Sequence, residues 1–254
     1  MSLHATYLGA NGWFLQFGPL RVLVDPWLRG PLVFPPGPWL LRGELPQERS
    51  LPGPPDLLLL TQGLSDHCHP PSLEGLDRDL PVVGSASAAK RVRQLGFRRV
   101  TALAPGERHR FQGLRITATA GAPVPQVENG YLLEHEQGRL YLEPHGYPPQ
   151  DLRTEPLDAV ITPVVDLGLP LAGAFVRGRT VLPELLQRFR PRTLLASTSG
   201  GNVRFSGLLA GLFWARGAAA EAEATVRRET AGQEGPVTRF IDPEPGRPYL
   251  LVGG

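Results

Sequence analysis

The sequence has very little cysteine and no long apolar run. Its single cysteine, Cys68, excludes an internal disulfide framework and is typical of a protein from a reducing compartment. No apolar segment approaches the roughly 20 residues that a membrane-spanning helix needs. The first residues also lack the basic region and apolar run of a signal peptide. We therefore expect a soluble, cytoplasmic protein without a transmembrane segment.

Lysine is equally scarce, and arginine carries almost all of the positive charge. Lys90 is the only lysine, and 26 basic residues against 24 acidic ones leave a formal net charge of +2. So small a net charge does not indicate a nucleic-acid partner, and none is expected. The hydrophobic fraction of 41% is ordinary for a globular protein.

A chain of 254 residues can bury a sizeable core, and we expect one domain over residues 1–254. Two segments of it differ from the rest. Residues 30–55 are rich in proline and are expected to form a surface loop over the site, because strands resume directly afterwards. Residues 217–238 are rich in Ala, Glu and Arg and should be helical. A further helix is expected over 182–189, with Pro183 in its first turn.

The most informative stretch is 56–69, which reads DLLLLTQGLSDHCH. Its four consecutive leucines predict a fully buried strand. The loop that follows carries Asp66, His67, Cys68 and His69, all of them potential metal ligands. Open α/β proteins place their chemistry at the carboxyl edge of the sheet, which is where this loop would lie.

This stretch resembles the ligand loop of the metallo-β-lactamase-fold superfamily, which reads T/S-H-x-H-x-D-H after an apolar strand. Thr61, Asp66 and His67 match the pattern. Residues 8–28, LGANGWFLQFGPLRVLVDPWL, are similar to the opening of the small hydrolase branch, and Asp25 stands where that branch has its first structural aspartate. The resemblance implies an α/β fold, a four-layered αββα sandwich of two mixed β-sheets flanked by helices.

The family holds two metal ions, and the resemblance implies that the ligands of the first are missing here. Gln62 and Leu64 occupy the first two histidine positions of the loop. Ala122 and Pro123 lie near the position of the family's middle histidine. Leucine cannot bind a metal, and a glutamine amide is a poor zinc ligand compared with imidazole.

The position of the family's bridging aspartate is also changed. Its phrase Y-F-x-G-D-T-G-Y corresponds to YLEPHGY at 141–147, so Glu143 and His145 replace the aspartate. The final histidine should follow 193–196, where the chain has STSGG at 197–201. This polar turn could form an anion-binding nest or a simple exposed turn.

Four residues therefore remain as candidate ligands: Asp66, His67, Glu143 and His145. Two carboxylates and two imidazoles suffice for one zinc, manganese or iron ion with an open position. Asp66 and His67 are also the candidate catalytic residues. Three alternatives stay open, each without a metal ion. Asp66 and His67 could be a relic that only organises its loop, or they could act as a metal-free acid/base dyad. Residues 143–145 could form a loop whose polar groups satisfy each other in a vacated cavity.

The most apolar segment outside the expected sheets is 205–214, FSGLLAGLFW. It is a helix candidate, and burial against the sandwich is the simpler expectation. An exposed apolar patch there would mark contact with a membrane or a protein partner.

Two functions follow from these observations. The first is a divergent hydrolase of the metallo-β-lactamase fold that uses at most one metal ion on an unknown small-molecule substrate. The second is a non-catalytic descendant of the fold that binds a small molecule or a protein partner in the emptied cleft.

Overall fold

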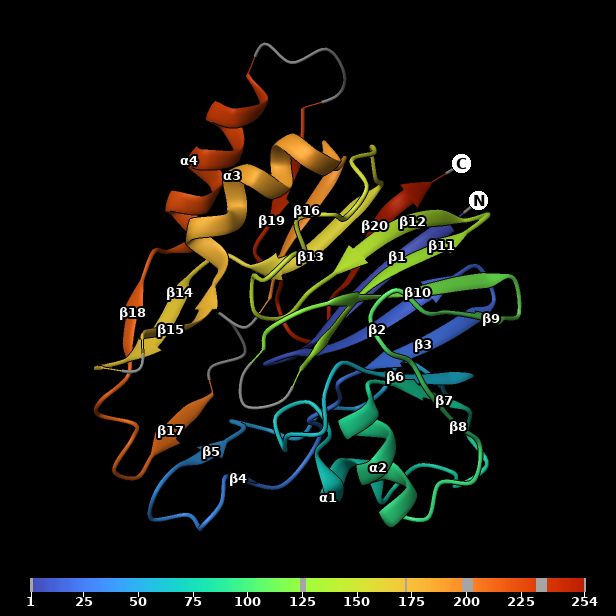
Figure 1. The fold of residues 1–254 in the computed structure, drawn as a ribbon, viewed down its shortest axis with the longest axis vertical. Helices are drawn as coiled ribbons and strands as arrows, with labels where there is room; N and C mark the ends of the chain where they lie inside the picture. The colour runs from blue at the N-terminus through green and yellow to red at the C-terminus, as the bar shows by residue number, and fades with distance from the viewer. Residues whose placement is uncertain (1, 124–126, 172, 198–202, 232–236, 254) are drawn as a thin grey trace.

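The computed structural model describes residues 2–123, 127–171, 173–197, 203–231 and 237–253. In these residues two seven-stranded mixed sheets pack face to face (Figure 1). The strands of the first sheet, in spatial order, are β20 (Pro248–Gly253), β1 (Ser2–Gly9), β2 (Gly12–Phe17), β3 (Leu20–Val24), β6 (Leu57–Leu60), β7 (Val82–Gly84) and β8 (Val100–Ala102). Those of the second are β19 (Arg239–Ile241), β16 (Thr193–Ser197), β13 (Ala159–Pro163), β12 (Gly138–Leu142), β11 (Asn129–His135), β10 (Leu114–Ala120) and β9 (Arg108–Phe111).

The main core lies between the two sheets. Apolar side chains from β1, β2, β3 and β6 meet those from β10, β11, β12 and β13, and they are almost entirely buried. This explains why 57–60 is four leucines without alternation: both faces of β6 are covered. One face belongs to the core between the sheets and the other packs under a helix.

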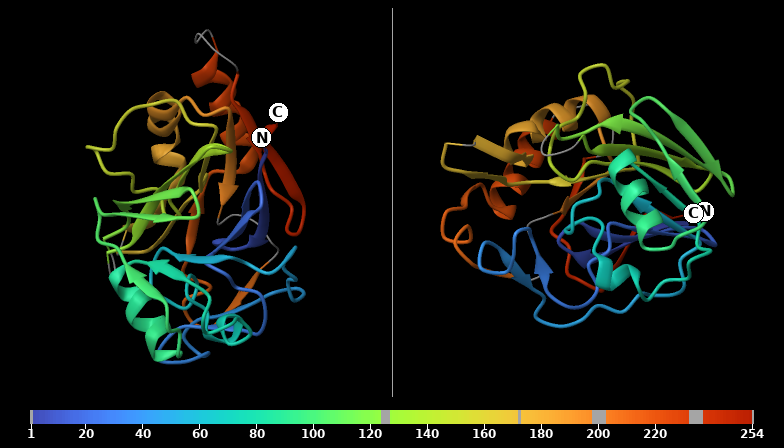
Figure 2. Two further views of the ribbon diagram at one scale, coloured as in Figure 1. Left: turned by 90° about the vertical axis from the view of Figure 1, so that its right-hand side faces the viewer. Right: turned by 60° about the horizontal axis from the view of Figure 1, so that its bottom comes forward.

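Helices cover the outer face of each sheet, as the four-layered αββα sandwich requires. The helices α1 (Pro70–Leu73) and α2 (Ala86–Gln94) lie on the first sheet, whose outer leucines pack against Ala88 and Val92 of α2. The helices α3 (Gly178–Phe189) and α4 (Ala219–Thr230) lie on the second sheet. Figure 2 shows α1 and α2 at the opposite end of the molecule from α4.

Two small sheets stand beside the sandwich. One contains β15 (Gly173–Arg177), β14 (Asp166–Leu169) and β18 (Trp214–Arg216); the other contains β17 (Arg204–Ser206), β5 (Arg42–Glu44) and β4 (Leu32–Val33). The proline-rich segment 30–55 thus supplies two short strands, and α4 occupies the middle of the segment 217–238.

Two local expectations were wrong. The helix α3 begins at Gly178, so Pro183 lies inside it instead of in its first turn; its opening residues Gly178 and Thr180 are weak helix formers and gave no signal. Residues 205–214 form no helix but contribute to β17 and β18 with a turn between them. Gly207 explains the turn, because its φ of +102° favours glycine and an added Cβ would lie 2.7 Å from the Leu40 carbonyl oxygen.

No helix within the described ranges has both the length and the apolar character needed to cross a membrane.

Candidate metal centre

The centre is built where three strands end at one edge of the sandwich. β3 and β6 are parallel neighbours, so Asp25 and Thr61, which follow them, emerge side by side. Asp25 Oδ1 accepts the backbone N–H of Thr61 at 2.8 Å, and Asp25 Oδ2 accepts the Thr61 hydroxyl. The third segment, which carries His145, follows β12 in the opposite sheet.

Asp25 fixes the ring of His67. The Nδ1 atom of His67 lies 2.8 Å from Asp25 Oδ2, and both side chains are completely buried. An imidazole whose Nδ1–H is held by a carboxylate presents Nε2 to the opposite side, which is the usual arrangement of a metal-binding histidine. The Nε2 atom of His67 lies 3.2 Å from Asp66 Oδ2 and 3.1 Å from the Asn11 side-chain nitrogen.

The charges around His67 are strongly coupled. Burial lowers the pKa of His67, but Asp66 and Asp25 outweigh it and raise that pKa well above its usual value. Burial raises the pKa of Asp66, yet His67 and His145 hold it below its ordinary value. For Asp25 burial wins, and its pKa is raised. Asp66 and Asp25 therefore favour the charged form of the His67 imidazole.

His145 is held in the same way by a residue that the sequence did not single out. Its Nδ1 lies 2.7 Å from Glu128 Oε2, and Glu128 is completely buried. The other Glu128 oxygen accepts the side-chain N–H of Gln62 at 3.0 Å. The pKa of Glu128 is raised by burial but lowered overall by His145 and His67. Burial lowers the pKa of His145, but the charge and hydrogen bond of Glu128 outweigh burial, so the pKa is raised overall.

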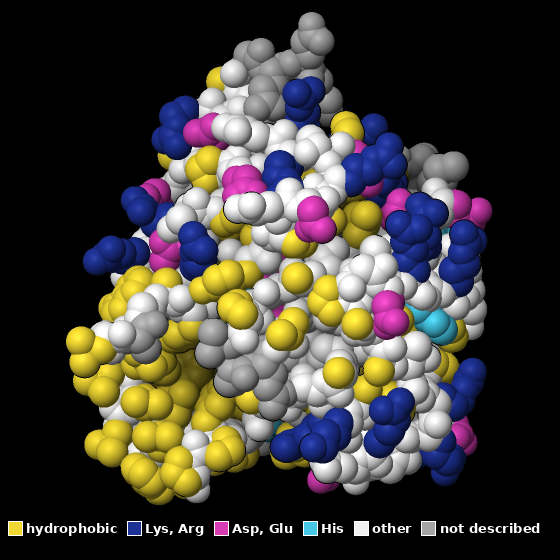
Figure 3. All heavy atoms as spheres, viewed as in Figure 1, with side chains coloured by type: hydrophobic (Ala, Val, Ile, Leu, Met, Phe, Trp, Pro, Cys, Tyr) yellow, Lys and Arg dark blue, Asp and Glu magenta, His cyan; other side chains and the backbone are white. Residues whose placement is uncertain are grey.

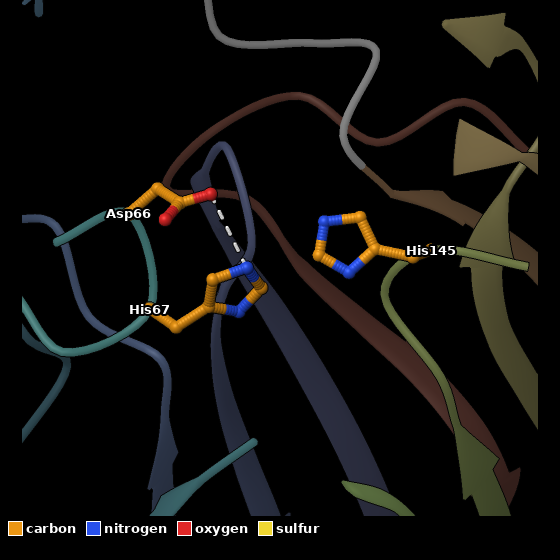
Figure 4. A group of neighbouring side chains, drawn as sticks. All are labelled: Asp66, His67 and His145. Carbon is orange, nitrogen blue, oxygen red and sulfur yellow. Dashed lines mark ion pairs between the residues drawn. The ribbon is translucent and has the colours of Figure 1, made fainter. Parts of the chain in front are cut away.

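Asp66, His67 and His145 come together around one space (Figure 4). One ligand atom from each of the three lies within 4.8 Å of the others. The ring centroids of the two histidines are 5.0 Å apart. Asp66 and His67 come from the loop after β6, whereas His145 comes from the loop after β12 in the other sheet (Figure 4).

Glu143 is placed differently from the other three sequence candidates and is not in this group of converging atoms. Its carboxylate accepts backbone N–H groups from His145 at 3.1 Å, from Tyr147 at 2.8 Å and from Gly146. Gly146 has a φ of +77°, and an added Cβ would lie 2.8 Å from the Arg177 carbonyl carbon, so this turn needs glycine. Burial and the charge of Glu128 raise the pKa of Glu143 to about 7. These bonds make Glu143 the organiser of the loop that presents His145.

The neighbouring loop residues point elsewhere. Cys68 is buried among apolar side chains of the first sheet, and burial raises the pKa of its thiol to about 12. His69 is 2.9 Å from the Ser72 hydroxyl through Nδ1 and 3.1 Å from the Pro31 carbonyl oxygen through Nε2. Of the polar turn 197–201, residues 198–201 lie outside the described residues.

The residues present fit one cation better than two. Asp66 Oδ1 is a buried oxygen for which the described residues provide no hydrogen-bond partner, and Asp66 is one of the three converging residues. One carboxylate and two imidazoles are a donor set that zinc, manganese and iron accept. At the other position of the family motif, Gln62 is bonded to Glu128 and Leu64 has no ligand atom.

The sequence did not identify Glu128 because the resemblance to the family predicts a histidine ligand near Ala122 and Pro123, and a carboxylate is not the residue expected there. The only available signal was an acidic residue directly before the strand that begins at Asn129, in a loop that otherwise lacks charge.

Comparison with known proteins identifies the family and the fold. A sequence family described as the beta-lactamase superfamily domain matches residues 4–197. No functionally curated protein matches the chain significantly.

Three solved structures illustrate the likeness of the fold. An isothiocyanate hydrolase from Delia radicum gut bacteria has a TM-score of 0.66 at 16% identity and covers 98% of this chain and 100% of its own. Igni18, a metallo hydrolase from the hyperthermophilic archaeon Ignicoccus hospitalis, has a TM-score of 0.64 at 15% identity, with 98% of each chain covered. The metallo-beta-lactamase fold protein YhfI from Bacillus subtilis has a TM-score of 0.63 at 13% identity, also with 98% of each chain covered.

Proposed function

Since the chain belongs to the metallo-β-lactamase superfamily, we propose that it is a hydrolase whose centre holds one metal ion, bound by Asp66, His67 and His145. The observation that carries this proposal is the matched support of the two imidazoles. Each has its Nδ1 on a buried carboxylate, Asp25 for His67 and Glu128 for His145, and both carboxylates lie within 2.8 Å of the ring nitrogen. A ring held through Nδ1 keeps Nε2 in a fixed direction, as a metal-binding imidazole requires.

In this proposal, residues around the two histidines orient them toward the metal ion. Asp25 and Glu128 fix the tautomer and plane of each imidazole, so Nε2 faces the ion instead of rotating away. Glu143 holds the loop of His145 through three backbone N–H groups. Bound there, a metal ion of this class supplies a hydroxide near neutral pH and polarises a carbonyl or phosphoryl oxygen.

The Gln62–Glu128 pair accounts for the use of one ion. Gln62 stands at the sequence position of one of the family's loop histidines, and its side chain forms a buried hydrogen bond of 3.0 Å with Glu128. The Glu128 carboxylate is thereby committed on both oxygens, to Gln62 and to His145.

A panel of chromogenic substrates tests the proposal. The metal-loaded protein is assayed with a β-lactam, a thioester, a phosphodiester and a lactone, alongside Asp66→Ala and His145→Ala. We expect at least one class to be hydrolysed, with the rate lost in both variants and kept in His109→Ala, whose side chain lies on β9. Loaded protein that turns over none of the four classes would contradict a hydrolase.

One observation favours the non-catalytic alternative. The Asn11 side-chain nitrogen lies 3.1 Å from His67 Nε2 and Asp66 lies 3.2 Å away, so the ring is satisfied within the protein. In this reading the buried ion pairs stabilise a binding cleft. A melting temperature that does not respond to chelator or to added metal would favour it.

A further inference from the structure

The surface beside the two small sheets carries large exposed apolar side chains (Figure 3). Figure 3 shows them gathered at its lower left around a hollow. Single exposed apolar residues are normal, but a contiguous group of this kind marks an interaction site. We call this group the apolar rim; the exposed fractions of its members are Trp39 59%, Leu171 109%, Phe175 38%, Phe205 48%, Leu208 67% and Leu212 51%.

The apolar rim is one surface made of three neighbouring turns. The turn between β4 and β5 contacts the turn between β17 and β18, because Leu208 donates its backbone N–H to the Trp39 carbonyl oxygen at 3.0 Å. The second turn contacts the hairpin of β14 and β15, where the rings of Phe213 and Phe175 meet at 5.8 Å. β18 also pairs directly with β14. Each turn therefore brings at least one bulky apolar side chain to the same edge.

The apolar rim is attached to the loops of the metal centre. Arg177 of β15 donates its backbone N–H to the His145 carbonyl oxygen at 2.8 Å. Tyr147, two residues beyond His145, donates its hydroxyl to the Ala174 carbonyl oxygen at 2.8 Å. On the other side, the Phe205 ring lies over Gly43, next to the buried Trp27.

The charges that flank the apolar rim are mainly positive. The segments 32–44, 166–177 and 203–216 contain four arginines and two carboxylates. Glu44 pairs with Arg42 at 2.9 Å, and Asp166 is buried and bonded to Thr180. Arg204 and Arg216 are exposed, and the Arg216 guanidinium lies 5.2 Å from the Trp214 ring. Among the described residues neither arginine forms an ion pair. Exposed arginine beside Trp, Phe and Leu is the composition of a surface that inserts into the headgroup region of an anionic membrane.

We propose that the apolar rim docks this protein on an anionic lipid surface. The turns enter the interface, and Arg204 and Arg216 lie at the headgroups. The charge argues against a second copy of the chain as the occupant, because a symmetric dimer would bring Arg204 and Arg216 of both copies into one interface. The inference does not depend on a metal ion or on turnover, so its failure would leave the proposed function untouched.

Vesicle sedimentation tests the proposal. The full chain is mixed with vesicles of phosphatidylcholine alone or with about one-third phosphatidylserine, a composition that attracts basic segments. We expect binding to the anionic vesicles. Replacing two of the three rim leucines in Leu208→Ser/Leu212→Ser should reduce partitioning by about tenfold or more, because two leucines leave the apolar phase. The matched control Leu250→Ser removes a leucine of similar exposure on β20 and should bind as the wild type does.

The arginines are tested separately with Arg204→Ala/Arg216→Ala. At roughly 1 kcal/mol for each arginine near an anionic surface, binding to the phosphatidylserine vesicles should fall about thirtyfold, with little change on neutral vesicles. Binding is also followed by tryptophan fluorescence. Trp13 and Trp27 are buried, whereas Trp214 on β18 is partly exposed beside the apolar rim. A blue shift on adding vesicles that is smaller in Trp39→Phe therefore places the apolar rim in the lipid without relying on the leucine variants.

Three outcomes overturn the proposal. In the first, the wild type stays in the supernatant with both vesicle types. In the second, binding persists in the leucine and arginine variants. In the third, the wild type binds no lipid but forms a dimer that Leu208→Ser/Leu212→Ser dissociates, which would make a second copy the occupant.

Discussion

Replacing Glu128 with glutamine tests the support of the metal centre directly. Glu128 is completely buried, and its Oε2 lies 2.7 Å from His145 Nδ1. Glutamine keeps the size of the side chain and one acceptor oxygen but removes the charge. Gln62 can rotate its amide to accept a hydrogen bond from the new glutamine, so the loss is concentrated at His145.

Two magnitudes follow from this geometry. A hydrogen bond to a charged group contributes about 1.5–3 kcal/mol, so the metal-free protein should lose about 2 kcal/mol of unfolding free energy. For a domain of this size that corresponds to roughly 4–8 °C in melting temperature. Loss of a carboxylate that orients a ligand histidine typically costs 10–100-fold in metal affinity, and we expect a loss in that range here.

The assay is calorimetric titration of metal-stripped protein with zinc, together with thermal unfolding. Glu134→Gln is the matched control, because Glu134 also holds a cation, Arg115 at 2.6 Å, but on the outer part of β11 away from the centre. It should leave zinc affinity unchanged. A Glu128→Gln protein with wild-type zinc affinity would refute the role assigned to Glu128.

Three further results are expected. Glu143→Gln should lower the melting temperature with or without metal. The amide nitrogen of glutamine cannot accept the two backbone N–H groups that Oε2 accepts, and each one left unpaired costs about 1–3 kcal/mol of unfolding free energy. A wild-type melting temperature would contradict this. The Cys68 thiol, buried and with its pKa raised to about 12, should resist iodoacetamide at pH 8 until urea unfolds the chain, whereas fast labelling of the native protein would show that the loop opens. The melting temperature of the metal-free protein should fall as the pH rises above about 6.5. The stabilisation by His67, whose folded pKa is raised, is lost as pH rises through that pKa, and Glu143, whose folded pKa is raised to about 7, loses its buried proton in the same direction. A melting temperature that climbs steadily to pH 8 would contradict the buried ion pairs.

The fold was largely predictable because its signals are local. The hairpin of β1 and β2 follows from Asn11-Gly12 between apolar runs, and the four leucines of β6 identify a strand covered on both faces. The small sheets were not predictable. Residues 204–206 pair with 42–44 across a long sequence separation, and no local pattern in a three-residue strand encodes its partner.

The site residues that belong to a sequence motif could be predicted, whereas those that meet only through tertiary packing could not. Asp66 and His67 stand in a recognisable loop, and His145 follows β12 within one position of a family ligand. Glu128 lies 17 residues before His145 in the chain and meets it only because β11 and β12 form a hairpin. Likewise, sequence alone cannot show that Glu143 turns back to its own loop, because this depends on the backbone conformation at Gly146.

Zinc titration of the metal-stripped wild type, beside Asp66→Ala and His145→Ala, tests the central claim most directly. The account predicts about one ion per chain, with binding lost in both variants and kept in His109→Ala. Two ions per chain, no binding by the wild type, or binding that survives both substitutions would contradict it.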